Sequence, residues 1–288
     1  MVRLAVMGMG RIGGEVAYLA AARGIVDDLV LCDSVDSLLR AQVLDLSHTG
    51  LDIGISTDVR EIPDADICVF SAGLPRNPSV KTRADLLDVN LPAARECSRL
   101  LKNYAGVLVP VTNPMDALNY FFCRTTGIDR ARCVGFGGQL DSARFALELK
   151  NRGVAAHGSV LGEHGEHQVP LFSGLPSVFS SGTREDILKR LRGSSMEVIR
   201  GKGGTVFGPA YHITELVRMI AEDTRERTIC SSVLEGEYGL SNCSLGVPVQ
   251  IGKNGILAID EWKLDPWEQE KMDEAGKFVG ELCRRAVS

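Results

Sequence analysis

The stretch Gly137–Phe145, with the sequence GGQLDSARF, holds an acid and a base three residues apart. Asp141 and Arg144 share one face of a helix that is predicted to begin in this stretch and to end at Gly153. The two side chains could neutralise each other. Alternatively, each faces its own partner, the carboxylate a histidine and the guanidinium an anionic substrate. The second alternative describes a catalytic site, for which the rest of the chain must supply the partners.

A histidine is available in the stretch Leu161-Gly-Glu-His-Gly-Glu-His167. The alternatives for this stretch are a turn with exposed histidines and a metal site. Its His-Gly-Glu-His spacing matches neither of the two common zinc-protease patterns, so we expect no bound metal.

Two further polar stretches follow strand-like runs. One is a loop with three cations, Ala72–Arg83, and the other is Val111–Asp116, where Asn113 ends a strand. Taken alone, the first is typical of a solvated basic loop and the second of a helix start.

A glycine-rich turn follows the first predicted strand, Val2–Met7. The turn, Gly8-Met-Gly-Arg-Ile-Gly13, leads into a predicted helix over Ile12–Ala22, and the next strand, Leu29–Cys32, ends in Asp33. The glycines permit a tight turn and a close approach to a pyrophosphate, which the helix N-terminus attracts. Asp33 would accept hydrogen bonds from the adenosine ribose and repel a 2′-phosphate, which favours NAD over NADP. We therefore predict NAD contacts from Gly8, Met9, Gly10, Arg11, Ile12, Gly13 and Asp33.

Length and composition indicate a globular protein. The 288 residues are 44% hydrophobic and 24% charged, enough for one large domain or two ordinary ones. A net charge of -5 offers no basic surface for nucleic acid or for a membrane, and no apolar run is long enough to span one. The N-terminal run is too short for a signal peptide. Eight cysteines without CxxC pairs, among them Cys32, Cys68 and Cys133 in apolar runs, predict buried free thiols in a reducing cytoplasm.

Continuous apolar strands alternate with helical patterns through the first half of the chain. Strands are predicted at Ile67–Ser71, Val107–Val111 and Cys133–Phe136, with helices over Leu86–Tyr104 and Met115–Thr126. This alternation predicts a parallel sheet that helices cover on both faces. In such a sheet ligands bind beyond the carboxyl ends of the strands, where the glycines and small polar residues of this sequence gather.

After Arg152 the pattern changes to shorter strands, which predicts a second half of the α+β type. We therefore expect an α/β protein with an NAD-binding Rossmann domain over residues 1–138 and a catalytic α+β domain over 139–288, the two sharing a cleft. In the second half, strands are predicted at Ser159–Leu161, Gln168–Leu171, Thr228–Leu234 and Leu245–Ile251, a hairpin turn at Lys253–Gly255, and helices at Glu185–Arg200, Pro209–Glu222 and Pro266–Ala286.

Taken together, these stretches resemble the lactate/malate dehydrogenase family, and in particular its short archaeal-type malate dehydrogenases. The resemblance implies reversible NAD-dependent hydride transfer between malate and oxaloacetate, a reaction of the tricarboxylic acid cycle. The alternatives are a dehydrogenase of lactate or another 2-hydroxy acid, and a dinucleotide-binding protein without turnover. The resemblance spans the whole chain, and its markers are Gly8–Gly13, Ala72–Arg83, Val111–Asp116, Leu140–Phe145, Gly162–Gly165, Gly204–Ala210 and Gly246–Val249.

The resemblance implies a role for each matching residue. His164 exchanges a proton with the substrate, and Asp141 accepts a hydrogen bond from its other ring nitrogen, which fixes the tautomer. Arg144 binds the substrate C1 carboxylate, and Arg83 polarises the carbonyl. Asn113 is expected to bind the substrate oxygen. Coenzyme contacts are implied for Asn90, Val111, Thr112 and Asn113, and a contact with the substrate or the nicotinamide for Thr205.

Substrate choice is expected to depend on Arg76, because the matching residue is arginine in malate dehydrogenases and glutamine in lactate dehydrogenases. The loop from Arg76 to Arg83 resembles a lid that excludes water. It is one residue longer than the family pattern and has Ser79 where glycine is usual, so Lys81 is an alternative cation for the second carboxylate.

The family resemblance also implies a homodimer or homotetramer. Two apolar helix stripes, Ala17–Ala22 and Glu215–Ile220, are candidates for a subunit interface, and each is equally compatible with a place in the core of a single chain.

Overall fold

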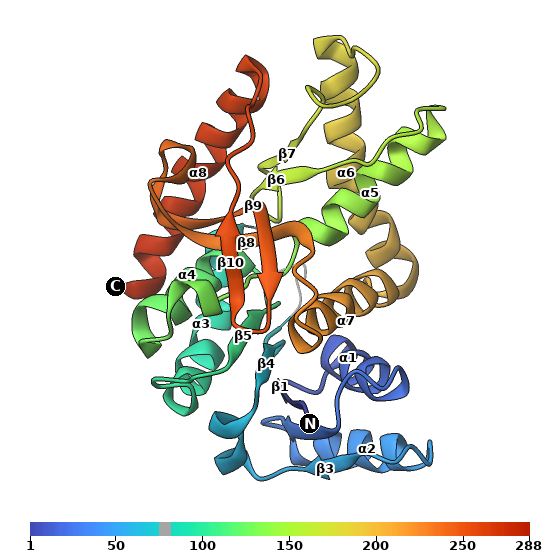
Figure 1. The fold of residues 1–288 in the computed structure, drawn as a ribbon, viewed down its shortest axis with the longest axis vertical. Coiled ribbons are helices and arrows are strands. Elements are labelled where there is room, and N and C mark those ends of the chain that lie inside the picture. The colour runs from blue at the N-terminus through green and yellow to red at the C-terminus, as the bar shows by residue number, and fades with distance from the viewer. Residues whose placement is uncertain (75–81) are drawn as a thin grey trace.

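The structure is a computed structural model that describes residues 1–74 and 82–288. Two α/β halves pack against each other, with the N-terminal half in the lower part of Figure 1 and most of the C-terminal half above it. The predicted combination of a Rossmann domain and an α+β domain is confirmed. The N-terminal half contains β1 (Arg3–Met7), α1 (Arg11–Ala22), β2 (Asp28–Cys32), α2 (Asp36–Ser47), β3 (Gly54–Ser56), β4 (Ile67–Phe70), α3 (Arg83–Leu100), β5 (Val107–Pro110) and α4 (Met115–Thr126).

The five strands of the N-terminal half form one parallel sheet in the order β3-β2-β1-β4-β5. The strand order reverses between β1 and β4, the place where a doubly wound sheet binds its ligand. Because Met7 pairs with Phe70 at the ends of these strands, Gly8 and Ser71 follow at the same edge of the sheet. The predicted glycine-rich turn therefore lies at the switch point.

The C-terminal half contains a second sheet in which β9 is the central strand. β9 pairs antiparallel with β8 and β10, and through Gly246 with β6, which in turn pairs with β7. The predicted hairpin between β9 and β10 is confirmed, and within it the positive φ, 91°, falls on Gly255. The elements are α5 (Gly138–Asn151), β6 (Val160–Gly162), β7 (Gln168–Pro170), α6 (Ser181–Lys202), α7 (Phe207–Ala221), β8 (Arg227–Glu235), β9 (Ser241–Gly252), β10 (Gly255–Ile259) and α8 (Pro266–Val287).

The prediction of a regular strand at Cys133–Phe136 is wrong. The segment makes single bridges only, Cys133 to Leu108 of β5 and Gly135 to Ser231 of β8. Its backbone N–H groups alternate between the two sheets, those of Val134 and Phe136 donating to β5 and that of Gly135 to Ser231, so no continuous ladder forms on either side. Instead it joins the two sheets and delivers the chain to the start of α5, where Asp141 and Arg144 lie.

The start of α3 also differs from the prediction. The helix begins at Arg83, not at Leu86, because Thr82 and Asp85 form a capping box in which each side chain accepts a hydrogen bond from the other residue's backbone N–H. Arg83 is therefore the first residue of a helix and not part of a loop. The predicted bounds of α4, with Pro114 before it and Gly127 after it, are confirmed.

The larger hydrophobic cluster contains residues of both halves, and a smaller one lies between α5, α6 and β6. Helix α1 packs against α7, and the two lie side by side near the middle of Figure 1. Ala17 and Ala20 of α1, and Leu216, Val217 and Ile220 of α7, are buried. The buried side chains of both stripes therefore pack in the core of this chain, and a part for these helices in a subunit interface stays a prediction.

The eight cysteines are free thiols. Cys68 and Cys133 are buried as predicted, whereas Cys32, at the end of β2, is only partly buried. Among the described residues, no helix combines the length and the apolar character that a membrane crossing requires.

Candidate active site

The glycine-rich turn has the geometry that a dinucleotide requires. Gly8 has a φ of 99°, and a Cβ atom there would lie 2.4 Å from the backbone N of Ala72 in the loop after β4. A Cβ on Gly13 would lie 1.9 Å from the carbonyl of Gly8, so only glycine lets α1 approach the turn. Around Gly10, by contrast, no atom lies within 4 Å of such a Cβ. The turn is packed on its inner side and open at Gly10, which fits a pyrophosphate at the N-terminus of α1.

Asp33 lies next to this turn. One carboxylate oxygen accepts a hydrogen bond from the backbone N–H of Met9 at 2.7 Å, and the other accepts from Val35 at 2.8 Å. Each oxygen keeps a second lone pair for a ribose hydroxyl. Asp33 therefore also holds the turn against the end of β2, a structural role that sequence reasoning did not assign.

Two side chains that the sequence analysis did not single out support the same turn. Ser71 donates a hydrogen bond to the carbonyl of Gly8 at 2.8 Å. Gln42 of α2 donates to the carbonyl of Met9 at 3.0 Å. Neither belongs to a local motif, so only the fold reveals these contacts.

Asn90, Thr112 and Asn113 connect the loops that follow β4 and β5. The Asn90 amide is buried, donates to the carbonyl of Asn113 at 2.7 Å and accepts from the N–H of Leu74 at 2.7 Å. The Thr112 hydroxyl donates to the carbonyl of Ala72 at 2.8 Å. Asn90 therefore connects the two loops by hydrogen bonds. The direct contacts of Asn90 and Val111 with the coenzyme stay predictions.

The pair of residues at the start of α5 meets the predicted histidine. Nδ1 of His164 lies 2.7 Å from one carboxylate oxygen of Asp141, and Nη1 of Arg144 lies 3.1 Å from the other. The structure combines parts of both alternatives, because the Asp141 carboxylate contacts the histidine and the guanidinium at once, while the contact of Arg144 with an anionic substrate stays a prediction. Because a carboxylate oxygen can only accept, Nδ1 of His164 carries the proton of this contact, and Nε2 is available to a substrate.

Burial and charge oppose each other at Asp141. Burial raises the pKa of this carboxyl, but the neighbouring His164 and Arg144 outweigh it and hold the pKa below its usual range. The acid therefore stays ionised at neutral pH, where it can orient and stabilise an imidazolium. Gly137, with a φ of 153°, makes room for this pair, because a Cβ there would lie 2.5 Å from Cγ of the His164 ring.

Arg83 enters the site from the N-terminus of α3. Its Nη1 donates to the side-chain oxygen of Asn113 at 3.2 Å, and its Nη2 donates to the backbone carbonyl of His164 at 3.1 Å. Its Nε lies 3.2 Å from a carboxylate oxygen of Glu163. Arg83 and Asn113 come from the N-terminal half and His164 from the C-terminal half, so the site forms where the two halves meet.

Asp116, in α4, is a buried acid that sequence reasoning quoted in a motif without giving it a role. Its carboxylate accepts from the backbone N–H of His164 at 2.9 Å and from the hydroxyl of Ser231 at 2.6 Å. Burial raises the pKa of Asp116 to about 7, and the nearby charge of Glu163 adds to this rise while the two hydrogen bonds oppose it. Asp116 fixes the backbone of the residue that is predicted to transfer the proton.

Three predicted residues have no contact in this cluster that the described residues show. Thr205 lies between α6 and α7 and makes no hydrogen bond that the described structure shows. Arg76 and Lys81 lie outside the described residues.

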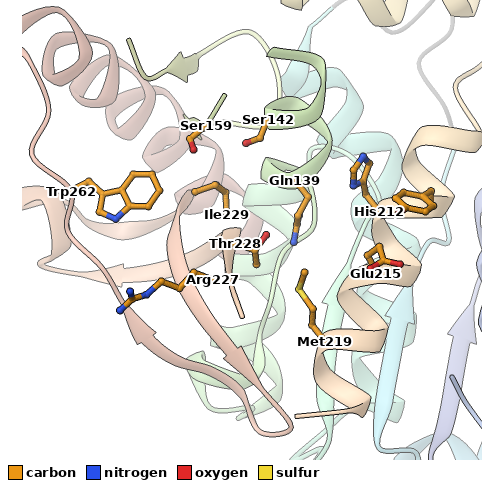
Figure 2. A pocket seen from close by; sticks show the side chains of 11 residues that line it. Gln139, Ser142, Ser159, His212, Glu215, Met219, Arg227, Thr228, Ile229 and Trp262 are labelled. Carbon is orange, nitrogen blue, oxygen red and sulfur yellow. The ribbon is translucent and has the colours of Figure 1, made fainter. Parts of the chain in front are cut away.

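Figure 2 shows a pocket of about 370 Å³ between α5, α7 and β8, lined among others by Gln139, His212 and Trp262. None of the predicted site residues that the structure describes lines this pocket. The candidate active site is therefore the cluster around His164, on another face of α5.

A parallel nucleotide-binding sheet, joined to a histidine–aspartate pair and two arginines, defines an NAD-dependent oxidoreductase. Comparison with known proteins gives its family. The family model for the lactate/malate dehydrogenase NAD binding domain matches residues 2–135, and that for the lactate/malate dehydrogenase alpha/beta C-terminal domain matches residues 138–282. The chain belongs to the lactate/malate dehydrogenase family.

Relatives and solved structures match over nearly the whole chain. The malate dehydrogenase of Halobacterium salinarum is 38% identical, over 96% of this chain and 97% of its own. The malate dehydrogenase of Archaeoglobus fulgidus, solved in complex with NADH, is 31% identical with a TM-score of 0.90 and full coverage of both chains. The lactate dehydrogenase of Cryptosporidium parvum, solved with lactic acid and nicotinamide adenine dinucleotide, is 27% identical with a TM-score of 0.90, over 99% and 98% of the two chains.

Proposed function

We propose that this protein is an NAD-dependent malate dehydrogenase that interconverts malate and oxaloacetate. The contact of 2.7 Å between His164 and Asp141, with Arg83 and Arg144 beside it, is the observation that supports this proposal most directly. The malate dehydrogenase relatives support the choice of substrate.

The turn Gly8–Gly13 and Asp33 would hold the coenzyme, which when bound would supply the hydride for oxaloacetate reduction or accept it in malate oxidation. Nε2 of His164 donates a proton to the carbonyl oxygen as the alcohol forms, and the ionised Asp141 stabilises the imidazolium beforehand. Arg144 has one N–H committed to Asp141 and can bind the substrate carboxylate with others. Arg83 faces the same space and stabilises the charge that develops on the oxygen.

Substrate choice is proposed to depend on Arg76, with Lys81 as the alternative cation. Oxaloacetate brings a second carboxylate that can pair with such a cation in a closed pocket, whereas pyruvate brings a methyl group and would leave the cation unpaired. A mismatch of this kind is worth roughly 10³-fold or more in kcat/KM. The lactate dehydrogenases among the similar structures make lactate the second candidate substrate.

Steady-state oxidation of NADH with oxaloacetate and with pyruvate tests this proposal. We expect oxaloacetate to be preferred by orders of magnitude, and Arg76→Gln to reduce the preference. Comparable kcat/KM for the two acids would favour the lactate alternative. No turnover with either acid would contradict both.

Assembly, location and domain boundary are further parts of the proposal. We expect a homodimer or homotetramer, which light scattering can check. Eight free thiols favour a reducing, cytoplasmic location. We place the boundary between the NAD-binding domain, 1–138, and the catalytic domain, 139–288, at the start of α5.

A further inference from the structure

Glu163 is a buried carboxylate next to the proton-transferring histidine. Only 2% of its side chain is exposed, and a buried carboxylate is costly unless charged or hydrogen-bonded partners compensate it. The sequence motif that contains Glu163 drew attention to His164 alone. The partners of Glu163 show what the acid does.

The two oxygens of Glu163 have different partners. Oε2 accepts hydrogen bonds from the backbone N–H of Glu166 at 3.0 Å, from the backbone N–H of His167 at 2.9 Å, and from Nδ1 of His167 at 3.0 Å. These contacts anchor the acid in its own turn. Oε1 points the other way and lies 3.2 Å from Nε of Arg83, whose side chain is 13% exposed.

A glycine lets the acid and the guanidinium meet. A Cβ atom on Gly165 would lie 2.2 Å from Nη2 of Arg83 and 2.3 Å from Oε1 of Glu163. Any larger residue would therefore enter the space between the two charged groups. The contact requires both the acid at position 163 and the glycine at position 165.

The contacts of Arg83 account for all three nitrogens of its guanidinium. A guanidinium carries five N–H groups, one on Nε and two on each Nη. Nε lies 3.2 Å from Oε1 of Glu163 in an ion pair that lacks hydrogen-bond geometry, whereas one Nη1–H is donated to Asn113 and one Nη2–H to the carbonyl of His164. Within residues 1–74 and 82–288, one N–H on each Nη makes no hydrogen bond and is left for the substrate, and the two hydrogen bonds already made fix the plane of the guanidinium in which both lie.

We propose that Glu163 is a positioning residue for Arg83. It holds the guanidinium from its buried side, so that the two remaining N–H groups face the substrate carbonyl before the substrate binds. The acid thereby links the direction of the polarising group to the same turn that carries His164. This inference rests on the proposed role of Arg83 in the dehydrogenase reaction.

Glu163→Gln is the central test. Glutamine can still accept the backbone hydrogen bonds of the turn, but it lacks the charge that holds Arg83. We expect kcat to fall by about 10²-fold, in the range found when one preorganised donor is lost, while the Kd of NADH stays unchanged. The kinetic isotope effect with 4-deuterated NADH should rise, because hydride transfer becomes slower relative to the other steps.

His167→Gln is the matched control, because His167 contacts Oε2 and not the oxygen that faces Arg83. If Glu163 only stabilises its turn, the two variants should lose kcat to a similar degree, and that result would overturn the proposal. We expect the control to keep kcat within about 3-fold of the wild type. Gly165→Ala is an independent variant that should lower kcat as Glu163→Gln does, and Tm values verify that each variant is folded.

A crystal structure of Glu163→Gln separates this inference from the proposed function. We expect Arg83 to leave the carbonyl of His164 and the side chain of Asn113. If the Arg83 guanidinium keeps its position in Glu163→Gln, the positioning role of Glu163 is overturned, whatever the activity of the variant. A wild type that reduces neither oxaloacetate nor pyruvate contradicts the proposed function instead, and the structure of the variant still decides whether Glu163 positions Arg83.

Discussion

At the scale of single residues, Asp141 shows how one buried acid can serve two cations. The three-residue spacing to Arg144 was visible in the sequence, and it left open whether the two would pair or would face separate partners. The structure resolves this because a carboxylate has two oxygens, and His164 and Arg144 each take one. Spacing along a helix predicts neighbours on that helix, but a partner twenty-three residues away depends on the fold.

Replacing His164 with asparagine should separate binding from chemistry. Asparagine cannot act as a general acid near neutral pH, so turnover should fall by about 10²-fold or more. The fluorescence titration of NADH should be unchanged, because the coenzyme site is formed by the N-terminal sheet. A variant that retains most of its kcat would contradict the proton-transfer role of His164.

Gly137→Ala should disturb the same histidine from the opposite side. The new Cβ would lie 2.5 Å from Cγ of the His164 ring, at a backbone φ that side chains rarely adopt. We expect a loss of kcat together with a loss of stability of about 1–3 kcal/mol. Gly10→Ala, where no atom lies within 4 Å of the new Cβ, is the control for stability. Urea unfolding and steady-state kinetics measure both effects.

At the scale of helices and strands, the bounds of α4 were predictable because proline and glycine mark both of its ends. The start of α3 was missed by three residues, since Thr82 and Asp85 cap the helix before its apolar pattern begins. The segment Cys133–Phe136 was missed for another reason. Its apolar residues are buried between two sheets, and composition does not distinguish such a bridge from a strand.

Thr82→Ala is the test at this scale. Loss of the cap should destabilise the first turn of α3 by about 1 kcal/mol. Because that turn carries Arg83, we also expect a lower kcat with little change in the affinity for NADH. An unchanged kcat would show that the contacts of Arg83 hold its position without the helix cap.

At the scale of the whole molecule, α4 connects the two halves through a buried polar network. Asn119 donates to the hydroxyl of Ser244 at 2.9 Å, Ser244 contacts Ser231 at 2.8 Å, and Ser231 donates to Asp116. This network and the shared hydrophobic core predict that the halves unfold together. The sequence indicated two halves but not this coupling, because hydrogen-bonded partners in the network lie up to 125 positions apart.

Asp116→Asn should change how stability depends on pH. Burial raises the pKa of Asp116 to about 7 from 3.8, so between these values the folded chain holds a proton that the unfolded chain has released. Stability contributed by this group is therefore lost as the pH rises through 7. The free energy of unfolding of the variant, minus that of the wild type, should therefore rise by about 1–4 kcal/mol from pH 4 to pH 8. Chemical unfolding at both pH values measures this, and a difference that does not vary with pH would contradict it.

The contact of Asp116 with both His164 and Ser231 also bears on protein engineering. A chimera that joins the coenzyme half of one relative to the catalytic half of another could be cut near the start of α5, between the two matched family models. Here such a cut would separate α4 from the strands and the histidine loop that its polar residues support. A hybrid in which α4 comes from the same relative as the catalytic half would preserve these contacts, so the better junction for recombination lies before Met115.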